Sequence, residues 1–255
     1  MDDPIIDLQD VWFGYNGQMI LQGIDLKVER GDFIAMIGPN GGGKTTLLKV
    51  ILGLYKPLRG TVVVKGRSAD KASSFIGYVP QNVHINSSFP ITVLDVVLMG
   101  KLSPGRFFKH DTKMDRQQAM EALGRMQIED LAGERIGELS GGQKQRVFIA
   151  RSLVTDPEIL LLDEPTASID SKGQSDFLKL LVELNKTITI LVVSHDLFAI
   201  SSFVKSVACV NRRLHYHMPA TNREDTMNAA YRCTVEDTCP VEKLHLTSTK
   251  HEVAE

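Results

Sequence analysis

The chain has 255 residues, of which 43% are hydrophobic, and its formal net charge is −2. This composition excludes a disordered, collagen-like or disulfide-stapled chain and predicts one or two domains around a sizeable core. The 29 Lys and Arg are balanced by 31 Asp and Glu, so the sequence has no overall basic excess of the kind that favours binding of nucleic acid.

The three cysteines lie late in the sequence and are too few to staple the fold, which is typical of a protein in a reducing compartment. No segment offers 18 uncharged apolar residues, and the acidic start at residues 1–4 is unlike a signal peptide. We therefore expect a cytosolic chain that does not itself cross a membrane.

Short β-like segments alternate with glycine-containing turns over the first 65 residues. One of them, residues 33–37, is apolar at consecutive positions, which is typical of a parallel strand covered on both faces. A helical pattern begins soon after it. The elements predicted in this part are strands at 5–13, 25–28, 33–37 and 61–64 and a helix at 44–54.

From about residue 84 to 155 the sequence becomes helical in pattern, which predicts a helical subdomain inserted into the α/β core. Strand-like segments return at 159–162 and 189–193, with a helix at 177–184 between them. The core is therefore expected to be split in sequence. After Asn211 the chain is polar, and we expect an irregular tail over 211–255 with one short helix at 223–231.

Residues 38–45 fit the pattern G-x-x-x-x-G-K-[ST], directly after an apolar strand and directly before a helix. Glycines let the backbone curl so that several N–H groups point at phosphate oxygens. The helix start and Lys44 add positive charge, and the Thr45 hydroxyl can bind Mg²⁺ at the outer phosphates. The pattern predicts a nucleotide-binding loop made of Gly38, Pro39, Asn40, Gly41, Gly42, Gly43, Lys44, Thr45 and Thr46.

Two acidic residues, Asp163 and Glu164, end the apolar strand predicted at 159–162. Charge at such a place is costly unless a cation or water compensates it. A strand beside the phosphate loop would bring Asp163 next to Mg²⁺ and Glu164 within reach of an attacking water. We therefore expect Asp163 to bind the metal and Glu164 to act as general base; the alternative is an ordinary strand end.

A second glycine loop precedes a helix predicted at 144–153, with Ser140 at the N-cap position. It predicts a second helix end that can bind an anion, about 100 residues after the first. A plain helix cap is the alternative. The candidate residues are Ser140, Gly141, Gly142 and Gln143.

Between about Ile5 and Val210 the sequence resembles the ATP-binding-cassette (ABC) family, because Leu139–Gln143 is similar to the signature loop of that family. The resemblance implies an α/β fold over residues 1–210: a P-loop NTPase core of the ABC type with an antiparallel β subdomain and the inserted helical subdomain. It also implies an ATPase with ATP and Mg²⁺ as cofactors.

Other residues resemble single motifs of the family. Tyr15 resembles the aromatic residue that stacks on adenine, and Gln81 the glutamine that senses Mg²⁺ and couples to the membrane subunit. Residues 168–170 are similar to the loop that crosses the dimer, and His195 to the histidine that contacts the γ-phosphate. The resemblance implies Lys44, Gln81, Glu164 and His195 as catalytic residues and Thr45, Gln81 and Asp163 as metal-binding residues.

The resemblance also implies the partners. In a head-to-tail homodimer, the Ser140 loop of one copy would close on ATP held by the Lys44 loop of the other. A lone cassette implies separate permease subunits, a place on the cytoplasmic face of the membrane and, indirectly, a periplasmic or extracellular substrate-binding protein, with no nucleic acid involved. Residues 89–100 look most like the cassettes of zinc and manganese uptake systems, so import of a divalent metal is expected.

Several alternatives stay open. Iron-chelate importers are close relatives, and the chain could instead be a soluble ABC ATPase acting on nucleic acid or ribosomes, a kinase, or an interaction module. The apolar positions Val93, Val97, Phe107 and Phe108 could receive a helix of the permease or belong to the core. The tail offers side chains for a regulatory metal, or merely surface residues: His215, Tyr216, His217, Cys233, Cys239, His245 and His251.

Overall fold

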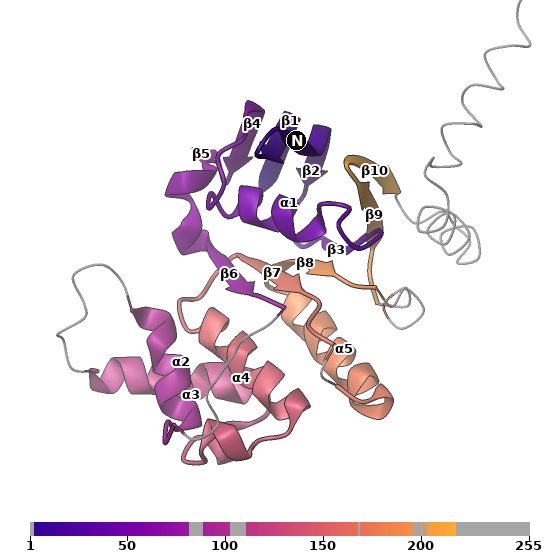
Figure 1. Ribbon diagram of the computed structural model, residues 1–255. Coiled ribbons are helices and arrows are strands. Elements are labelled where there is room, and N and C mark those ends of the chain that lie inside the picture. The colour runs from indigo at the N-terminus through magenta and orange to yellow at the C-terminus, as the bar shows by residue number, and fades with distance from the viewer. Residues whose placement is uncertain are drawn as a thin grey trace, which may run out of the picture. The chain divides into compact units, whose positions relative to one another are not determined.

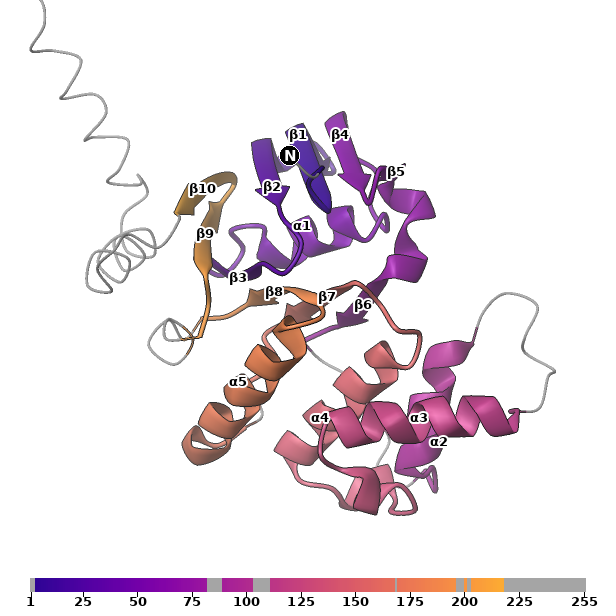
Figure 2. The ribbon, with the colours of Figure 1, turned by 180° about the vertical axis from the view of Figure 1, so that it is seen from behind.

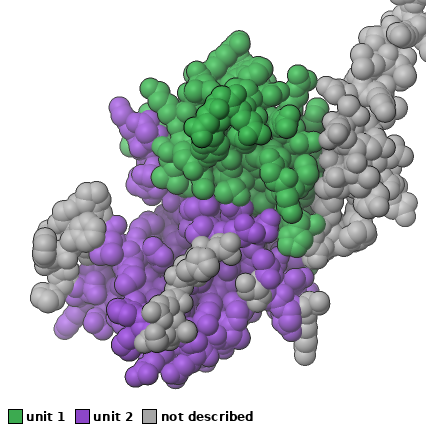
Figure 3. Space-filling view, in the orientation of Figure 1, with its two compact units in different colours: residues 1–69, 193–255 green, residues 70–192 purple. Residues whose placement is uncertain are grey.

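The computed structural model describes residues 3–81, 89–102, 111–167, 169–195, 200 and 203–217. The chain divides into two compact units, residues 1–69 with 193–255 and residues 70–192 (Figure 3). Several features singled out from the sequence lie outside the described residues: Phe107, Phe108, Ser168, the helix expected at 223–231, Cys233, Cys239, His245 and His251.

The first unit contains an antiparallel sheet with the strand order β2-β1-β4-β5 (Figure 1). β1 and β2 form a hairpin whose turn, Asn16 and Gly17, has positive φ angles at both residues, as a tight hairpin turn requires. Buried and more exposed residues alternate along much of β1, so one face is covered. This is the antiparallel part predicted from the sequence. The bounds are β1 Ile6–Tyr15, β2 Gln18–Val28, β4 Arg59–Val64 and β5 Arg67–Ser68.

The same unit contains β3 (Phe33–Ile37) and α1 (Lys44–Ile51), with the glycine loop between them. All five residues of β3 are buried, as its unbroken apolar sequence predicts. β9 (Ser206–Asn211) lies parallel to β3, with Ile37 opposite Cys209. A segment near the end of the described chain thus flanks the strand that leads into the glycine loop.

The expectation of an irregular tail from residue 211 is wrong for residues 213–217. Arg213–His217 form β10, which pairs antiparallel with β9 from Arg213 opposite Asn211 to His217 opposite Val207. The sequence is polar, but backbone pairing with a buried strand satisfies the N–H and C=O groups that face β9. Edge strands tolerate polar side chains, so composition alone did not reveal this strand.

Three strands of the second unit lie in the order β8-β7-β6: β8 (Thr189–Val193), β7 (Ile159–Asp163) and β6 (Ile76–Val79). β7 and β8 are buried at every position. β6 pairs with β7 in parallel, and the pairing runs without a shift from Ile76 opposite Ile159 to Val79 opposite Leu162. This register decides which residues meet where the two strands end.

The described residues of the second unit include four α-helices, and three of them, α2, α3 and α4, pack against one another (Figures 1 and 2). These three begin with a reciprocal capping box, formed by Thr92 with Asp95, Thr112 with Asp115 and Ser140 with Gln143. They fall within the range where the sequence predicts helices. The bounds are α2 Val93–Leu98, α3 Lys113–Arg125, α4 Gly141–Leu153 and α5 Ser171–Asn185.

Val93 and Val97 of α2 are fully buried, at 0% exposure. They pack in the core of the unit, so of the two alternatives left open for Val93 and Val97, core packing is confirmed and a surface for a partner helix is excluded. Within the described part of the chain, we find no helix that combines the length and the apolar character needed to cross a bilayer.

Two glycines of the second unit offer a matched test of the packing. A Cβ atom added at Gly100 would lie 2.1 Å from the carbonyl oxygen of Arg151 in α4, whereas one added at Gly124 in α3 would meet nothing within 4 Å. We expect Gly100→Ala to lower the free energy of unfolding by about 1–3 kcal/mol. Gly124→Ala should raise it by roughly 0.5–1 kcal/mol, because alanine favours a helix. Urea unfolding of the two variants checks this, and an unchanged Gly100→Ala protein would contradict the close approach.

Candidate functional site

The glycine loop between β3 and α1 needs its glycines for two physical reasons. Gly38 and Gly43 have φ angles of 145° and 104°, which side chains rarely allow. In addition, a Cβ at Gly38 or Gly42 would lie 2.0 or 2.7 Å from the carbonyl oxygen of Val210 in β9. The loop therefore curls against the backbone of β9 in a form that only glycine permits.

Lys44 begins α1 and directs its ammonium group back into this loop. The residue is only 6% exposed, and its Nζ donates to the carbonyl oxygens of Gly38 at 2.8 Å and Pro39 at 2.9 Å. The N–H groups of the first turn of a helix have no partners within the helix. Together with the buried cation, they make the start of α1 a site for an anion such as a phosphate group.

The turn between β9 and β10 supports the loop. The Arg212 N–H donates to the carbonyl oxygen of Gly42 at 2.9 Å, and the Gly42 N–H donates to Pro39 at 3.0 Å. Thr45 and Thr46, the next residues of α1, are half-buried beside it. The predicted residues 38–46 thus form one continuous cradle.

Tyr15 lies at the end of β1 in the same unit and is 41% exposed. Its ring lies edge-on to the Phe13 ring at 4.9 Å and edge-on to the Tyr55 ring at 5.5 Å between centroids. Burial of its hydroxyl group and a hydrogen bond to Tyr55 raise the pKa of Tyr15 to about 12. An exposed, uncharged aromatic ring of this kind can stack on a nucleotide base.

His195 also belongs to the first unit. It lies two residues after the end of β8 and is exposed. The residue before it, Ser194, is buried, and its N–H donates to the carbonyl oxygen of Met36 in β3 at 3.1 Å. The backbone at the start of this loop is therefore tied to the strand that leads into the glycine loop.

The acidic pair predicted from the sequence lies in the second unit, at the end of β7. Asp163 is 2% exposed. Glu164 follows it with a φ angle of 49°, a left-handed conformation that is unfavourable for a residue with a side chain. Such conformations persist where surrounding contacts hold them, and they are frequent at functional sites.

Gln81 supplies one of these contacts. Its Nε2 donates to the Glu164 Oε2 at 2.7 Å. Gln81 lies two residues beyond Val79 of β6 and Glu164 two residues beyond Leu162 of β7, the pair that ends the ladder. The in-register parallel pairing thus brings the two side chains together. The sequence predicted both residues but not their contact, because the register of a strand pair is not visible in either strand alone.

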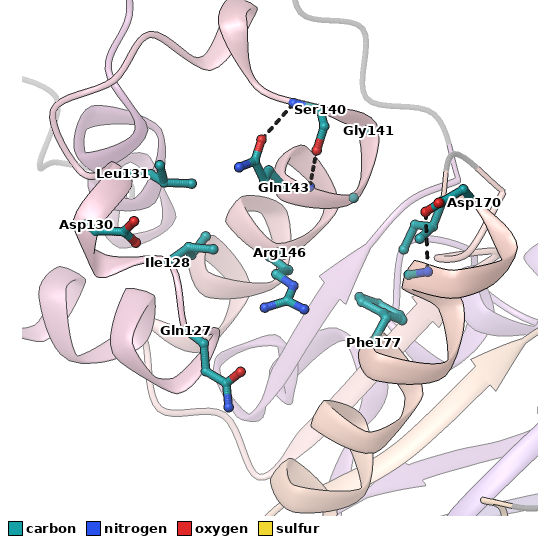
Figure 4. Close-up of a pocket in the computed structure, with 13 residues that line it drawn as sticks. Gln127, Ile128, Asp130, Leu131, Ser140, Gly141, Gln143, Arg146, Asp170 and Phe177 are labelled. Atoms are coloured by element: carbon teal, nitrogen blue, oxygen red, sulfur yellow. Dashed lines mark hydrogen bonds between the residues drawn. The ribbon is translucent and has the colours of Figure 1, made fainter.

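Ser140 caps α4 as predicted. Its Oγ accepts from the Gln143 N–H at 3.3 Å, and its own N–H donates to the Gln143 side chain at 2.9 Å. Figure 4 shows this cap beside a cavity of about 610 Å³. We call this cavity the Ser140 pocket. It is lined by residues of four segments, 127–131, 140–146, 169–170 and 173–177.

Packing within the chain does not demand a glycine at 142, because a Cβ there would meet only Ile169 at 3.7 Å. The glycine backbone at this helix start is therefore open to a ligand or to another protein chain. Arg146 directs its guanidinium group into the Ser140 pocket, where it also donates to the Met126 carbonyl oxygen at 3.2 Å (Figure 4). No motif marked Arg146 or Tyr55 in the sequence.

The candidate residues form two sets. One set, in the first unit, comprises Tyr15, residues 38–46 and His195; the other, in the second unit, comprises Gln81, Asp163, Glu164 and residues 140–143. Across the part of the chain that the structure describes, no group of three or more His, Cys, Asp or Glu residues could hold a metal ion. The regulatory metal site suggested for the tail involves residues outside that part and stays a prediction.

Comparison with known proteins identifies the family. Residues 21–167, more than half of the chain, match the family model described as "ABC transporter". The zinc uptake system ATP-binding protein ZurA of Listeria innocua is 42% identical over 220 residues, which are 83% of this chain and 84% of that protein. The manganese transport system ATP-binding protein MntB of Bacillus subtilis is 42% identical over 193 residues, 75% of this chain and 77% of that protein.

Solved structures agree with these matches. A nucleotide-free ATP-binding cassette from an ABC transporter superposes with a TM-score of 0.80 at 26% identity, covering 88% of this chain and 95% of that chain. A dimeric post-hydrolysis cassette, MJ0796 bound to ADP and Pi, superposes with a TM-score of 0.69 at 28% identity, covering 85% and 100%. The α/β fold with its phosphate loop is thus the fold of these cassettes, and the chain belongs to the ABC transporter family as an ATP-binding, ATP-hydrolysing subunit.

Proposed function

We propose that this chain hydrolyses ATP between two copies of itself and so drives uptake of a divalent metal through separate membrane subunits. The observation that carries the proposal is the 2.7 Å hydrogen bond from Gln81 to Glu164, directly after the buried Asp163. A carboxylate held in one orientation at the end of a buried strand is suited to activating a water molecule. The remaining candidate residues serve to bind and place the nucleotide.

ATP would be held by the first unit. The start of α1 and the Lys44 ammonium group would bind the outer phosphates, as the burial of that cation in the loop favours. The exposed ring of Tyr15 would stack on the adenine. His195, exposed two residues after the end of β8, would contact the γ-phosphate.

The side chains proposed to bind Mg²⁺ fit that ion chemically. Thr45 offers a hydroxyl oxygen, Asp163 a buried carboxylate and Gln81 an amide oxygen, and Mg²⁺ prefers such oxygen ligands. Because the Gln81 Nε2 donates to Glu164, its Oε1 is the atom left to meet a cation. When bound, Mg²⁺ would neutralise charge on the outer phosphates of ATP.

The dimer would complete the site. The Ser140 pocket combines a capped helix start, bare glycine backbone and the Arg146 guanidinium group. All three features attract an anion, and we propose that the pocket receives the ATP held by the Lys44 loop of a second copy. The dimeric relative bound to ADP and Pi supports this arrangement. ATP would then stabilise the closed dimer through its higher affinity for that state.

In the hydrolytic step, Glu164 would accept a proton from a water molecule as its oxygen attacks the γ-phosphorus. The bond to the bridging oxygen then breaks, which yields ADP and inorganic phosphate. Gln81 would orient the carboxylate, and Lys44 and His195 would stabilise charge on the phosphate oxygens. After cleavage the bridging triphosphate is gone, and the two copies would separate.

Glu164→Gln tests this role, because it preserves the shape of the side chain and removes its basicity. We expect the ATPase rate to fall roughly 10²- to 10⁴-fold while ATP binding persists, so that a long-lived ATP-bound dimer accumulates. Steady-state phosphate release and light scattering measure the two effects. Glu183→Gln on α5 is the control, since that carboxylate is exposed and forms a surface ion pair with Lys186 at 2.6 Å. Normal turnover in Glu164→Gln would exclude Glu164 as the base.

The surface proposed to meet the permease is a groove of about 520 Å³ in the second unit, which we call the Met99 groove. Met99 and Leu102 line it and are 42% and 53% exposed, whereas Phe148 at its floor is buried. Exposed apolar side chains around a hollow are typical of protein-binding surfaces. The groove also includes Tyr78 to Pro80, directly before Gln81, so a bound helix could act on the residue that orients Glu164.

Leu102→Glu places a charge in this groove and tests the assignment. We expect it to weaken co-purification with the permease by at least about tenfold, because an interfacial carboxylate would lose its water without gaining a partner. The ATPase activity of the chain alone should not change. Met114→Glu is the control, since Met114 is 62% exposed on α3 and does not line the groove. Equal co-purification of both variants would place the permease elsewhere.

The metal would be the cargo of the membrane subunits. The proposal rests on ZurA and MntB, whose names record zinc uptake and manganese transport and which are 42% identical to this chain. It places the chain as a peripheral subunit at the cytoplasmic face of the membrane, with a substrate-binding protein on the far side of the permease.

Metal uptake can be measured directly. In cells that depend on this cassette and its permease, we expect uptake of zinc or manganese to stop in Lys44→Ala, because the variant loses the buried cation of the phosphate loop. Radioactive zinc, manganese and iron chelate are supplied separately, with Lys179→Ala on the exposed surface of α5 as control. Uptake of iron chelate alone, or of none of the three, would contradict the proposed cargo.

A further inference from the structure

We infer that Tyr55 is a positioning residue for the nucleotide base: its ring and hydroxyl group hold the Tyr15 ring in the orientation in which it can stack on the base. The inference rests on the proposed function in one respect, the binding of the base by Tyr15. Tyr55 lies after α1 in sequence, carries no motif, and is placed beside Tyr15 only by the fold of the first unit.

Three rings form the cluster that carries this inference. The Tyr55 ring is stacked on Phe13, with centroids 5.1 Å apart and ring planes at 11°. The Tyr15 ring is perpendicular to both, at 89° to Phe13 and 88° to Tyr55. Phe13 is 6% exposed and anchors the cluster in the core, whereas Tyr15 keeps 41% of its surface exposed. Edge-to-face contacts of this kind favour one orientation of the Tyr15 ring over its other orientations.

Hydrogen bonds tie the same rings to α1. Tyr15 is hydrogen-bonded to both Tyr55 and Thr46, and Tyr55 also to Lys49. The hydrogen bond to Tyr15 lowers the pKa of Tyr55, while burial and the bond to Tyr55 raise that of Tyr15.

Lys49 of α1 also contacts Tyr55. Its ammonium group lies over the Tyr55 ring, 5.5 Å from the ring centre, and lowers the pKa of the hydroxyl group. The attraction between a cation and the face of an aromatic ring restrains both the orientation of the ring and the position of the cation. A chain of side-chain contacts thus starts at Thr46 on α1, the helix of the phosphate loop, passes through Tyr15 and Tyr55, and returns to α1 at Lys49.

These contacts should reduce the entropy cost of binding the base. A tyrosine ring that is free to change its rotamer must be immobilised when a base stacks on it, which costs conformational entropy. Tyr55 removes that freedom in advance. Its loss should therefore weaken binding of the base and leave binding of the phosphates intact.

The test uses the purified full-length chain and calorimetric titration with two probes, ADP and tripolyphosphate, the second of which has no base. We expect Tyr55→Phe, which keeps the ring and removes the hydroxyl group, to weaken ADP binding about two- to tenfold, the effect of one lost hydrogen bond. Tripolyphosphate should bind as it does to the unchanged protein. Leu54→Ala, on the neighbouring side chain that is 64% exposed, is the matched control and should change neither affinity.

A double-mutant cycle identifies the partner of the hydroxyl group. Tyr15→Phe removes the other hydroxyl group of the same bond, so the combined Tyr15→Phe, Tyr55→Phe protein should bind ADP no more weakly than the weaker-binding single variant. Effects that multiply would overturn the inference. So would ADP binding unchanged in Tyr55→Phe, or an equal loss of ADP and tripolyphosphate, which would indicate a general structural effect.

Tyr15→Ala separates this inference from the proposed function. If Tyr15→Ala loses ADP affinity and Tyr55→Phe does not, Tyr15 remains the base-binding residue and only the positioning role of Tyr55 is excluded. If Tyr15→Ala binds ADP normally, the base lies elsewhere and both assignments are wrong. Thermal unfolding of each variant shows that a change in affinity does not come from an unfolded fraction.

Discussion

The parallel pairing of β6 with β7 is the constraint on which the proposed chemistry depends. Its ladder runs in register to Val79 and Leu162, so the residues two places further on, Gln81 and Glu164, meet at hydrogen-bonding distance. A slip by one residue would turn each side chain of the strand to the other face. Burial of every residue of β7 makes such a slip costly, and the apolar core thereby sets the geometry of the polar pair.

The phosphate loop depends on a second, separate constraint. Gly38 and Gly42 lie so close to the Val210 carbonyl oxygen that no other residue would fit, and the Arg212 N–H holds the Gly42 carbonyl group. The loop is thus shaped by β9 and the turn to β10, which are about 170 residues away in the sequence. A local motif of eight residues therefore relies on backbone that the motif does not contain.

The elements that could be predicted from the sequence are those whose pattern is local, and the elements that were missed depend on distant parts of the chain. The strands predicted at residues 33–37, 159–162 and 189–193 are almost entirely apolar, and the structure has them within one residue of the prediction. β6 was missed because four residues with a glycine and a tyrosine give no clear pattern, and β10 because an edge strand needs only backbone pairing. The site divides in the same way: the sequence marked Lys44, Asp163 and Glu164, whereas the contacts of Gln81 and Tyr55 depend on register and tertiary packing.

Helix α1 connects the two ends of the proposed nucleotide. Its first residue, Lys44, directs a cation into the phosphate loop. Two later residues of the same helix, Thr46 and Lys49, contact Tyr15 and Tyr55, the tyrosines proposed to bind and position the base. A rigid helix of eight residues keeps these positions at a constant separation. The phosphates and the base would therefore be bound by side chains that are fixed to the same helix. The two binding places could not move independently to fit a differently shaped ligand. This arrangement would favour a nucleotide whose base and outer phosphates lie at one fixed separation.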